Sequence, residues 1–477
     1  MNASYVRNEF PTFLEINEPS LAFGDRDNNK GRSISAHPLK GLVTYGPFSY
    51  AQLAGFMDAV RIALIAPTDN ANVAQRVVTE LRSRWQPGER LDYVVNYPGV
   101  HSVFGTDVAL ADPTTTVLLS PDLDDQLAKA SNPRQTLAHA LSGAVADIAR
   151  RSSEYDVVLI RLPERWRPWF TGDDDFDLRR YMKAAAAARG ISTQIITDNA
   201  LGYKDRCSVA WRLAIALYTK AGGIPWKLAE SDPRTAYLGI GYALRSSGGN
   251  RFVRCCAQVF DADGVGLEFV GFSAADKEVA KIIDDDPFLT RPQMHAVISR
   301  SLALYQRQHA GRLPRRLVVH KTTHFATQES EGAFDAAGGV NEVELLRLQQ
   351  HTPWLAVRGT SQGKPDSWPA HRGTVVRLSD TDLLVWTQGN APVVAKRGNF
   401  YKEGRGIPHP LMVTRFAGHG PATEVASDVL ALSKMNWNND ALYDEIPVTI
   451  SYAKTLARVL TRLPSLSGPA YAFRLFM

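Results

Sequence analysis

Four polar side chains with the chemistry of an anion-binding site fall within one short part of the chain. Arg179 and Lys183 are four residues apart in a segment with helical periodicity, so the two cations share one helix face. Gln194 opens the apolar stretch that follows, and Lys220 precedes the glycines of "YTKAGGIPWKL". Two or three cations and an amide that converge on one point form a pocket for a phosphate group. A solvated helix face and a lysine that caps a helix end explain the same residues without any ligand.

The segments around these residues alternate between strand and helix patterns. "YDVVLIRLP" and "STQIIT" are predicted strands, and predicted helices follow over 173–190 and 206–223. This alternation indicates a parallel α/β sheet, whose ligands bind at the carboxyl ends of the strands. Upstream we expect short strands and turns over 1–48, helices over 49–67, 72–85 and 132–153, and strands over 91–99 and 115–120.

A second unit is expected to begin near residue 225. "AYLGIGYAL", "RFVRCCAQVF" and "GVGLEFV" are three consecutive strand patterns, followed by a helical stretch over 285–311 and the strand "RRLVVHK". Three antiparallel strands, a helix and a further strand are the order of an RNase H-like fold. Further along we predict helices over 338–350, 421–435 and 447–463, and strands over 353–359, 374–380, 382–389 and 391–398.

Composition is that of a folded soluble protein with two or three domains. The chain has 477 residues, of which 44% are hydrophobic, and no apolar run is long enough to span a membrane. The net charge of +5 favours an anionic partner only weakly. The chain has three cysteines, and their spacing is not that of metal ligands. The N-terminus is polar, unlike a signal peptide. Both observations indicate a reducing cytoplasm.

The order of the four polar residues, together with "YTKAGGIPWKL", resembles the MID domain of Argonaute proteins. The resemblance implies that Arg179, Lys183, Gln194 and Lys220 hold the 5′-phosphate of a guide strand. The first position departs from the usual Tyr or His, which stacks on the first guide base. We therefore expect an α/β fold with a Rossmann-like MID domain over 1–225, N-terminal strands included, and an RNase H-like PIWI domain over 226–477.

The resemblance also implies a metal ion beside the guide phosphate. The sequence ends "YAFRLFM", and in this family a terminal carboxylate folds back to the phosphate pocket. The carboxylate of Met477 and the amide of Gln194 would then hold Mg²⁺ against the phosphate. Simple packing of an apolar chain end is the alternative.

Three positions where nucleolytic PIWI domains carry metal ligands have other residues here. The first strand has Gly241, the segment after "LVVHK" has Thr322 or Thr323, and the last helix has Lys454. Two-metal hydrolysis needs carboxylates around two cations, which Gly, Thr and Lys cannot supply. We therefore expect an inactive site, although Gly241 alone is also explained by close packing. Asp261, Asp263 and Glu268 are nearby acids that we interpret as solvated turn residues.

Taken together, the resemblance is to a short prokaryotic Argonaute without N and PAZ domains. It implies a guide RNA, a single-stranded DNA target and a heterodimeric partner that carries an APAZ domain. That APAZ domain would be fused to a Sir2, TIR or nuclease effector. Target recognition would activate the effector, and the resulting loss of NAD would stop infection by phage or plasmid. An active guided endonuclease that uses unrecognised carboxylates is the main alternative, and a subunit that has lost guide binding is a third. "RWRPWF" over 165–170 and "HKTTHF" over 320–325 are weaker nucleic-acid candidates. The first fits an interface or a packed loop as well, and the second fits a core histidine with its hydrogen bonds satisfied.

Overall fold

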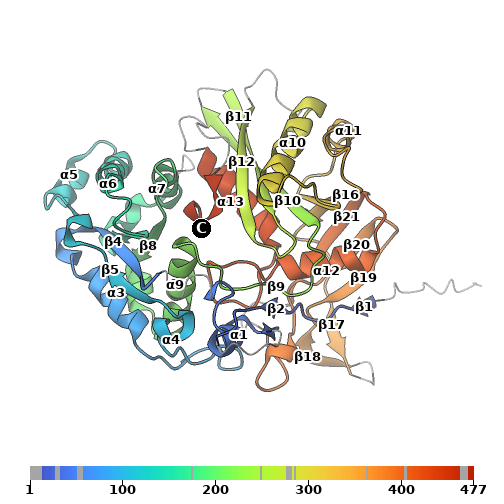
Figure 1. Ribbon diagram of the computed structural model, residues 1–477, viewed down its shortest axis with the longest axis horizontal. Coiled ribbons are helices and arrows are strands. Elements are labelled where there is room, and N and C mark those ends of the chain that lie inside the picture. The colour runs from blue at the N-terminus through green and yellow to red at the C-terminus, as the bar shows by residue number, and fades with distance from the viewer. Residues whose placement is uncertain are drawn as a thin grey trace, which may run out of the picture.

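The computed structural model places two α/β units side by side, with the C-terminus between them (Figure 1). It describes residues 13–26, 33–50, 57–172, 176–247, 250–274, 282–283, 286–360, 362, 364–401, 406–461 and 471–477. Among these residues, no helix is both long and apolar enough to cross a membrane.

The first unit is a five-stranded parallel sheet covered by helices. β4 (Ala59–Pro67) is central and pairs with β5 (Asp107–Leu110), β6 (Thr116–Leu119) and β7 (Val157–Leu162), and β7 pairs with the edge strand β8 (Thr193–Thr197). Every residue of β7 is buried, as expected for a strand with helices on both faces. The helices are α3 (Val73–Arg82), α4 (Val100–Phe104), α5 (Leu123–Lys129), α6 (Pro133–Ala149), α7 (Leu178–Ala187), α8 (Asp198–Gly202) and α9 (Arg206–Lys220), with short 3-10 turns η1 (Thr68–Asn70), η2 (Pro113–Thr115) and η3 (Glu164–Trp169).

The second unit is built on a ten-stranded mixed sheet, ordered β1-β19-β20-β21-β16-β15-β10-β11-β12-β22. Strands β10 (Thr235–Ser247), β11 (Asn250–Phe260) and β12 (Gly266–Ala274) form the antiparallel meander, and β15 (Arg316–Lys321) joins β10 in parallel. The other strands are β16 (Glu342–Gln349), β19 (Thr374–Arg377), β20 (Asp382–Val385), β21 (Leu411–Ala417) and β22 (Tyr471–Ala472), and the helices are α10 (Arg291–Gln308), α11 (Thr327–Ala336), α12 (Ala422–Leu432) and α13 (Val448–Leu460).

Alternation along β10 decides which helices cover which face of this sheet. Leu238 and Ile240 pack in the core formed with α10 and α11, whereas Gly239 and Gly241 face the backbone of α13. Because successive strand residues point to opposite faces, the glycines mark the surface on which α13 rests. The RNase H-like order expected for this unit is therefore present, with α13 between the sheet and the first unit (Figure 1).

The N-terminal segment, which the sequence analysis assigned to the first unit, contacts both: its first described strands pair with the second unit, and residues 38–45 contact α4 of the first. β1 (Phe13–Glu15) pairs with β19, and β2 (Leu21–Ala22) pairs with β3 (Ile34–Ser35) and β9 (Lys227–Leu228). The buried carboxylate of Glu18 explains the attachment, because it lies 2.9 Å from Arg372 Nε and 2.7 Å from Lys434 Nζ. Both cations are fully buried, so this carboxylate is their counter-charge. Residues 38–45, which fall in the stretch expected to hold only short strands and turns, form the helix α1 (Pro38–Tyr45).

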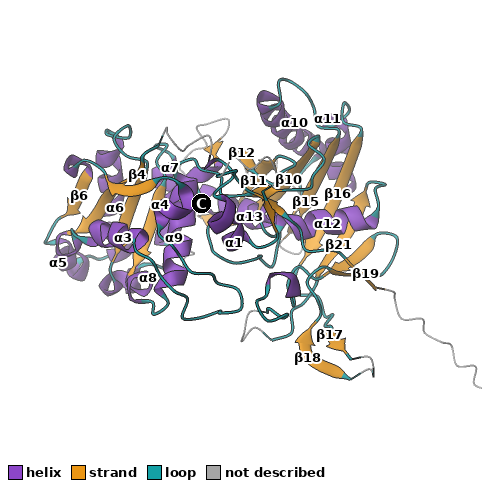
Figure 2. Cartoon of the chain, turned by 60° about the horizontal axis from the view of Figure 1, so that its bottom comes forward, coloured by secondary structure: helices purple, strands orange, loops and turns teal. Residues whose placement is uncertain are grey.

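Two further segments predicted as helices are strands. Residues 59–67 form β4 and residues 342–349 form β16, because both are buried inside their sheets. A short apolar run satisfies helix and strand periodicity alike until its neighbours are known. Residues 91–99 contain no strand element, and 391–398 holds a 3-10 turn, η4 (Pro392–Val394). Two small ladders complete the second unit: β13 (Ile282–Ile283) with β14 (Asp286–Pro287), and β17 (Val357–Gly359) with β18 (Pro365–Pro369), which projects from the body (Figure 2).

Candidate phosphate-binding pocket

A pocket of about 730 Å³ lies where the two units meet. Its walls come from α7, β8 and α9 of the first unit and from α13 and the chain end of the second. The structure brings five sequence candidates to this one pocket: Arg179, Lys183, Gln194, Lys220 and Met477. The geometry thus joins residues that are almost 300 positions apart, as the Lys183–Phe476 hydrogen bond shows (a separation of 293).

Lys220 is the last residue of α9 and forms the floor of the pocket. Its side chain is only 4% exposed, and its Nζ donates to Gln194 Oε1 at 2.5 Å. The amide nitrogen of Gln194 donates to the carbonyl of Ile195 at 3.1 Å, which fixes the orientation of the amide. Burial, and next the charge of Lys183, hold the pKa of Lys220 well below its usual range. An anion in this pocket would favour the ammonium form.

Lys183 lies on α7 and reaches the chain end. Its Nζ donates to the carbonyl of Phe476 at 3.1 Å. Burial, with the charge of Arg179 adding to it and Asp177 opposing it, lowers the pKa of Lys183 to about 8. Arg179 is exposed one turn earlier, at the mouth of the pocket. Two lysines with depressed pKa values side by side, and a third cation at the entrance, constitute a site built for negative charge.

Sequence reasoning missed three residues that line the pocket: Arg212 of the first unit, and Asn436 and Asn438 of the second. Arg212 lines the pocket on the same face of α9 as Lys220, eight residues earlier. The spacing of Arg212 and Lys220, two successive steps of four residues along a helix, could have indicated that both side chains line one pocket. Asn436 and Asn438 line the opposite wall, in the loop between α12 and α13, and nothing in their local sequence indicates a pocket.

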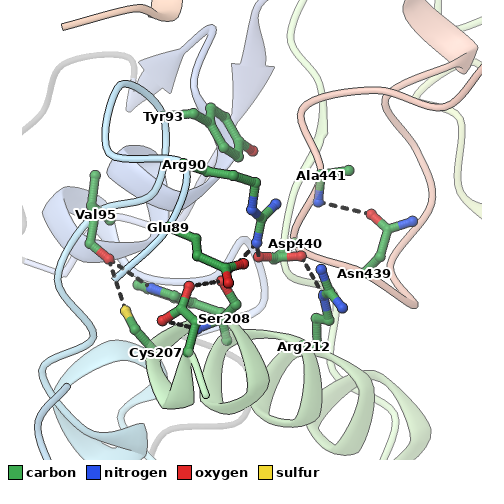
Figure 3. A network of polar contacts seen from close by, with 12 residues as sticks. Glu89, Arg90, Tyr93, Val95, Cys207, Ser208, Arg212, Asn439, Asp440 and Ala441 are labelled. Atoms are coloured by element: carbon green, nitrogen blue, oxygen red, sulfur yellow. Dashed lines mark hydrogen bonds and ion pairs between the residues drawn. The ribbon is translucent and has the colours of Figure 1, made fainter. Parts of the chain in front are cut away.

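Asp440, in the same loop, ties the two units together beside the pocket (Figure 3). Its carboxylate is 1% exposed and lies 2.5 Å from Arg90 Nη2 and 2.7 Å from Arg212 Nε. Arg90 also donates to Ser208 Oγ at 2.7 Å, so the network reaches the N-terminal turn of α9. A buried carboxylate with two guanidinium partners fixes the position of the loop against the first unit.

Asp440→Asn is expected to lower the unfolding free energy by about 2–3 kcal/mol, because it leaves Arg90 without its counter-charge. The figure is at the lower end for a broken buried pair because Arg212 remains 45% exposed on its side chain. The matched control is Asp147→Asn, which removes an exposed carboxylate 3.7 Å from Arg150. We expect the control to stay within about 0.5 kcal/mol of wild type. Urea unfolding measures the unfolding free energy of both variants, and equal values would show that the Asp440 network does not stabilise the protein.

Of the positions expected to be degenerate metal ligands, Gly241 is explained by close packing. A Cβ built on Gly241 would lie 2.4 Å from the carbonyl carbon of Ala453 and 2.7 Å from the main-chain nitrogen of Lys454. Gly241 therefore has the packing role that the sequence left as an alternative. Lys454 is half-buried, and its Nζ lies 3.4 Å from Gln350 Oε1. Thr322 is half-buried and Thr323 is buried, directly after β15.

Acidic residues near these positions are engaged elsewhere. In the described part of the chain, no group of three or more His, Cys, Asp or Glu side chains could hold a metal ion. Asp261 accepts a hydrogen bond from the Val265 nitrogen at 2.9 Å, and burial raises its pKa to about 6. Asp263 pairs with Lys227 at 3.0 Å. The side chain of Glu268 lies outside the described residues.

The two weaker nucleic-acid candidates differ in burial, because "HKTTHF" is mostly buried, whereas in "RWRPWF" only Trp166 is buried and Arg165 and Arg167 are exposed. Trp166 of "RWRPWF" is 1% exposed and donates to Asp124 Oδ1 at 2.6 Å. Lys321 is fully buried, 2.6 Å from Glu329, and His320 is fully buried with Nδ1 2.9 Å from Thr449 Oγ1. His324 is exposed but packs on Phe288, with ring centroids 4.4 Å apart.

Solved structures with a similar fold include Argonaute proteins. Clostridium butyricum Argonaute, bound to a guide DNA and a 19-mer target DNA, gives a TM-score of 0.65 at 14% identity, over 98% of this chain and 55% of that one. Aa-Ago with externally bound siRNA gives 0.61 at 14% identity, over 98% and 56%. A. aeolicus Argonaute gives 0.59 at 15% identity, over 98% and 56%.

Comparison by sequence gives no match. No family model matches the chain, and no curated protein matches it. The chain spans little more than half the length of the Argonaute structures above, at 55% and 56%. These likenesses show that the chain has an Argonaute fold, with MID-like and PIWI-like units, as the sequence predicted.

Proposed function

We propose that this protein is a guide-binding subunit whose pocket between the two units holds the 5′-phosphate of a short guide strand. The observation that carries the proposal is the convergence of Lys183, Lys220 and Gln194 on one pocket of an Argonaute fold. Lysine ammonium groups bind phosphate as compact charges, and the amide of Gln194 holds Lys220 in place. Arg179 at the mouth would meet the first nucleotide, where the guanidinium offers a flat face for stacking.

Base pairing along the guide would then read the target, while the protein recognises backbone and end group. We propose RNA as the guide and single-stranded DNA as the target. The C. butyricum structure contains a guide DNA, so binding of RNA and DNA guides of the same sequence should be compared directly. The effector is proposed to belong to a partner chain with an APAZ domain fused to Sir2, TIR or nuclease, which target binding would activate against phage or plasmid in the cytoplasm.

The first experiment is recovery of nucleic acid with the purified protein. We expect short strands bearing a 5′-phosphate, and we expect the loaded protein to capture a complementary DNA strand and to leave a scrambled one unbound. Protein that carries no short nucleic acid and captures neither strand would favour a purely structural subunit instead.

The loaded protein is expected to leave a matched target intact in the presence of Mg²⁺ or Mn²⁺. The reason is that Gly241, Thr322 and Lys454 occupy the positions that would need metal ligands. The measurement is gel analysis of an end-labelled complementary strand over a long incubation. Guide-dependent cleavage at one site would contradict this expectation and establish the alternative function, a guided endonuclease.

A further inference from the structure

One oxygen atom that the expected metal ion would use, Gln194 Oε1, already accepts a hydrogen bond from lysine. The resemblance implied Mg²⁺ held by Gln194 and a Met477 carboxylate. Gln194 Oε1 instead receives Lys220 Nζ at 2.5 Å. The carbonyl of Phe476, next to Met477, receives Lys183 Nζ at 3.1 Å. The Lys220 ammonium thus lies beside the Gln194 oxygen where the expected metal would bind, and the Lys183 ammonium contacts the main chain next to Met477.

The charges around the pocket also argue against a bound metal ion. Its lining includes five basic side chains, and Asp177 is its one acidic side chain among the described residues. That carboxylate caps α7 by accepting from the Arg180 nitrogen at 3.0 Å, and it also lies 3.5 Å from Arg180 Nε. Mg²⁺ is normally held by one or two carboxylates together with substrate phosphate. The basic side chains are Arg179, Arg180 and Lys183 of α7 and Arg212 and Lys220 of α9.

Two ammonium groups are sufficient for the charge of the ligand. A terminal phosphate carries about −1.5 to −2 at neutral pH, which two lysines match. A divalent cation placed beside them would be repelled by both ammonium groups. Lysine also donates hydrogen bonds to phosphate oxygens, so it supplies the directional contacts that a metal would otherwise give.

We infer that this pocket neutralises the 5′-phosphate with Lys183 and Lys220, and that guide binding needs no divalent metal. The inference deepens the proposed function and rests on it. Gln194 is then a positioning residue that holds Lys220, and the buried Met477 closes the wall of the pocket.

The test is the affinity of the protein for two otherwise identical oligonucleotides, one with a 5′-phosphate and one with a 5′-hydroxyl. Both are measured in millimolar Mg²⁺ and in EDTA at matched ionic strength, because salt alone changes phosphate binding. We expect the ratio of the two dissociation constants to agree within about twofold between the two conditions. A ratio that falls about tenfold or more in EDTA would overturn the inference and leave the proposed function standing.

Two further measurements separate the possible failures. A ratio near one in both conditions would overturn the proposed phosphate pocket, and the inference with it. The electron paramagnetic resonance of added Mn²⁺ reports metal binding directly. We expect the protein to withdraw no more Mn²⁺ from solution with the 5′-phosphate strand than with the 5′-hydroxyl strand. An additional bound ion that appears only with the phosphate would contradict the inference.

Discussion

Replacing Lys220 with Met should weaken selective binding of a 5′-phosphorylated guide while making the protein more stable. Lys220 is 4% exposed and its Nζ donates to the neutral amide oxygen of Gln194, so its ammonium is costly to bury. Met has a similar length without the charge and fits the same space. Each charge-assisted hydrogen bond to phosphate contributes about 1.5–3 kcal/mol, which is about 10- to 150-fold in affinity. Adding Lys183→Met should bring the loss to about 10²- to 10⁴-fold.

The opposite signs of the two effects separate binding from folding. A residue that only maintains structure would lose binding and stability together. Lys129→Met is the matched control, because it removes an exposed lysine from α5, outside the pocket lining. We expect the control to keep its preference for the phosphate. Guide affinity by fluorescence anisotropy and thermal unfolding test the set, and an unchanged preference in Lys183→Met/Lys220→Met would exclude the pocket.

Restoring a carboxylate in the first strand, by Gly241→Asp, is expected to destabilise the protein by about 3 kcal/mol or more and to restore no cleavage. The new Cβ would lie 2.4 Å from the Ala453 carbonyl carbon, and backbone of α13 cannot move aside as a flexible side chain would. α13 also rests on Gly239, where a Cβ would lie 1.9 Å from the Thr449 carbonyl oxygen. The helix would have to lift from β10, which disturbs the wall of the phosphate pocket as well.

Gly143→Ala is the control for the loss of a glycine. Gly143 lies in α6 with no atom near the position of a new Cβ, so alanine should stabilise by about 0.5–1 kcal/mol. Urea unfolding of the two variants gives both values. If Gly241→Asp unfolds at the same urea concentration as wild type, the contact between β10 and α13 is looser than the structure has it.

The convergence of the phosphate-pocket residues could be predicted, because it follows from local order. A helix with Arg179 and Lys183, a strand with Gln194 and a helix ending in Lys220 lie next to one another in any parallel α/β arrangement. Arg212 could have been added from its helical spacing. Its partner Asp440 could not, since 228 residues separate the two and only the packing of the units brings them together.

The errors in the fold have two physical origins. Buried strands such as β4 and β16 carry apolar residues on both faces, which removes the alternation that distinguishes a strand from a helix. The attachment of the N-terminal segment depends on Glu18 meeting Arg372 and Lys434, more than 350 residues away, as the separation of 354 shows. Gly241 likewise remained ambiguous until the backbone of α13 was placed against it.

The most direct test of the central claim is the affinity of the wild-type protein for a guide with a 5′-phosphate against the same strand with a 5′-hydroxyl. Losing the phosphate removes the contacts with both Lys183 and Lys220, and it leaves the two lysines in the pocket without an anion to favour their charged forms. We expect the phosphorylated strand to bind at least about tenfold more tightly. Equal affinities would contradict the account, because they would mean that the cations of this pocket do not recognise the end of a guide.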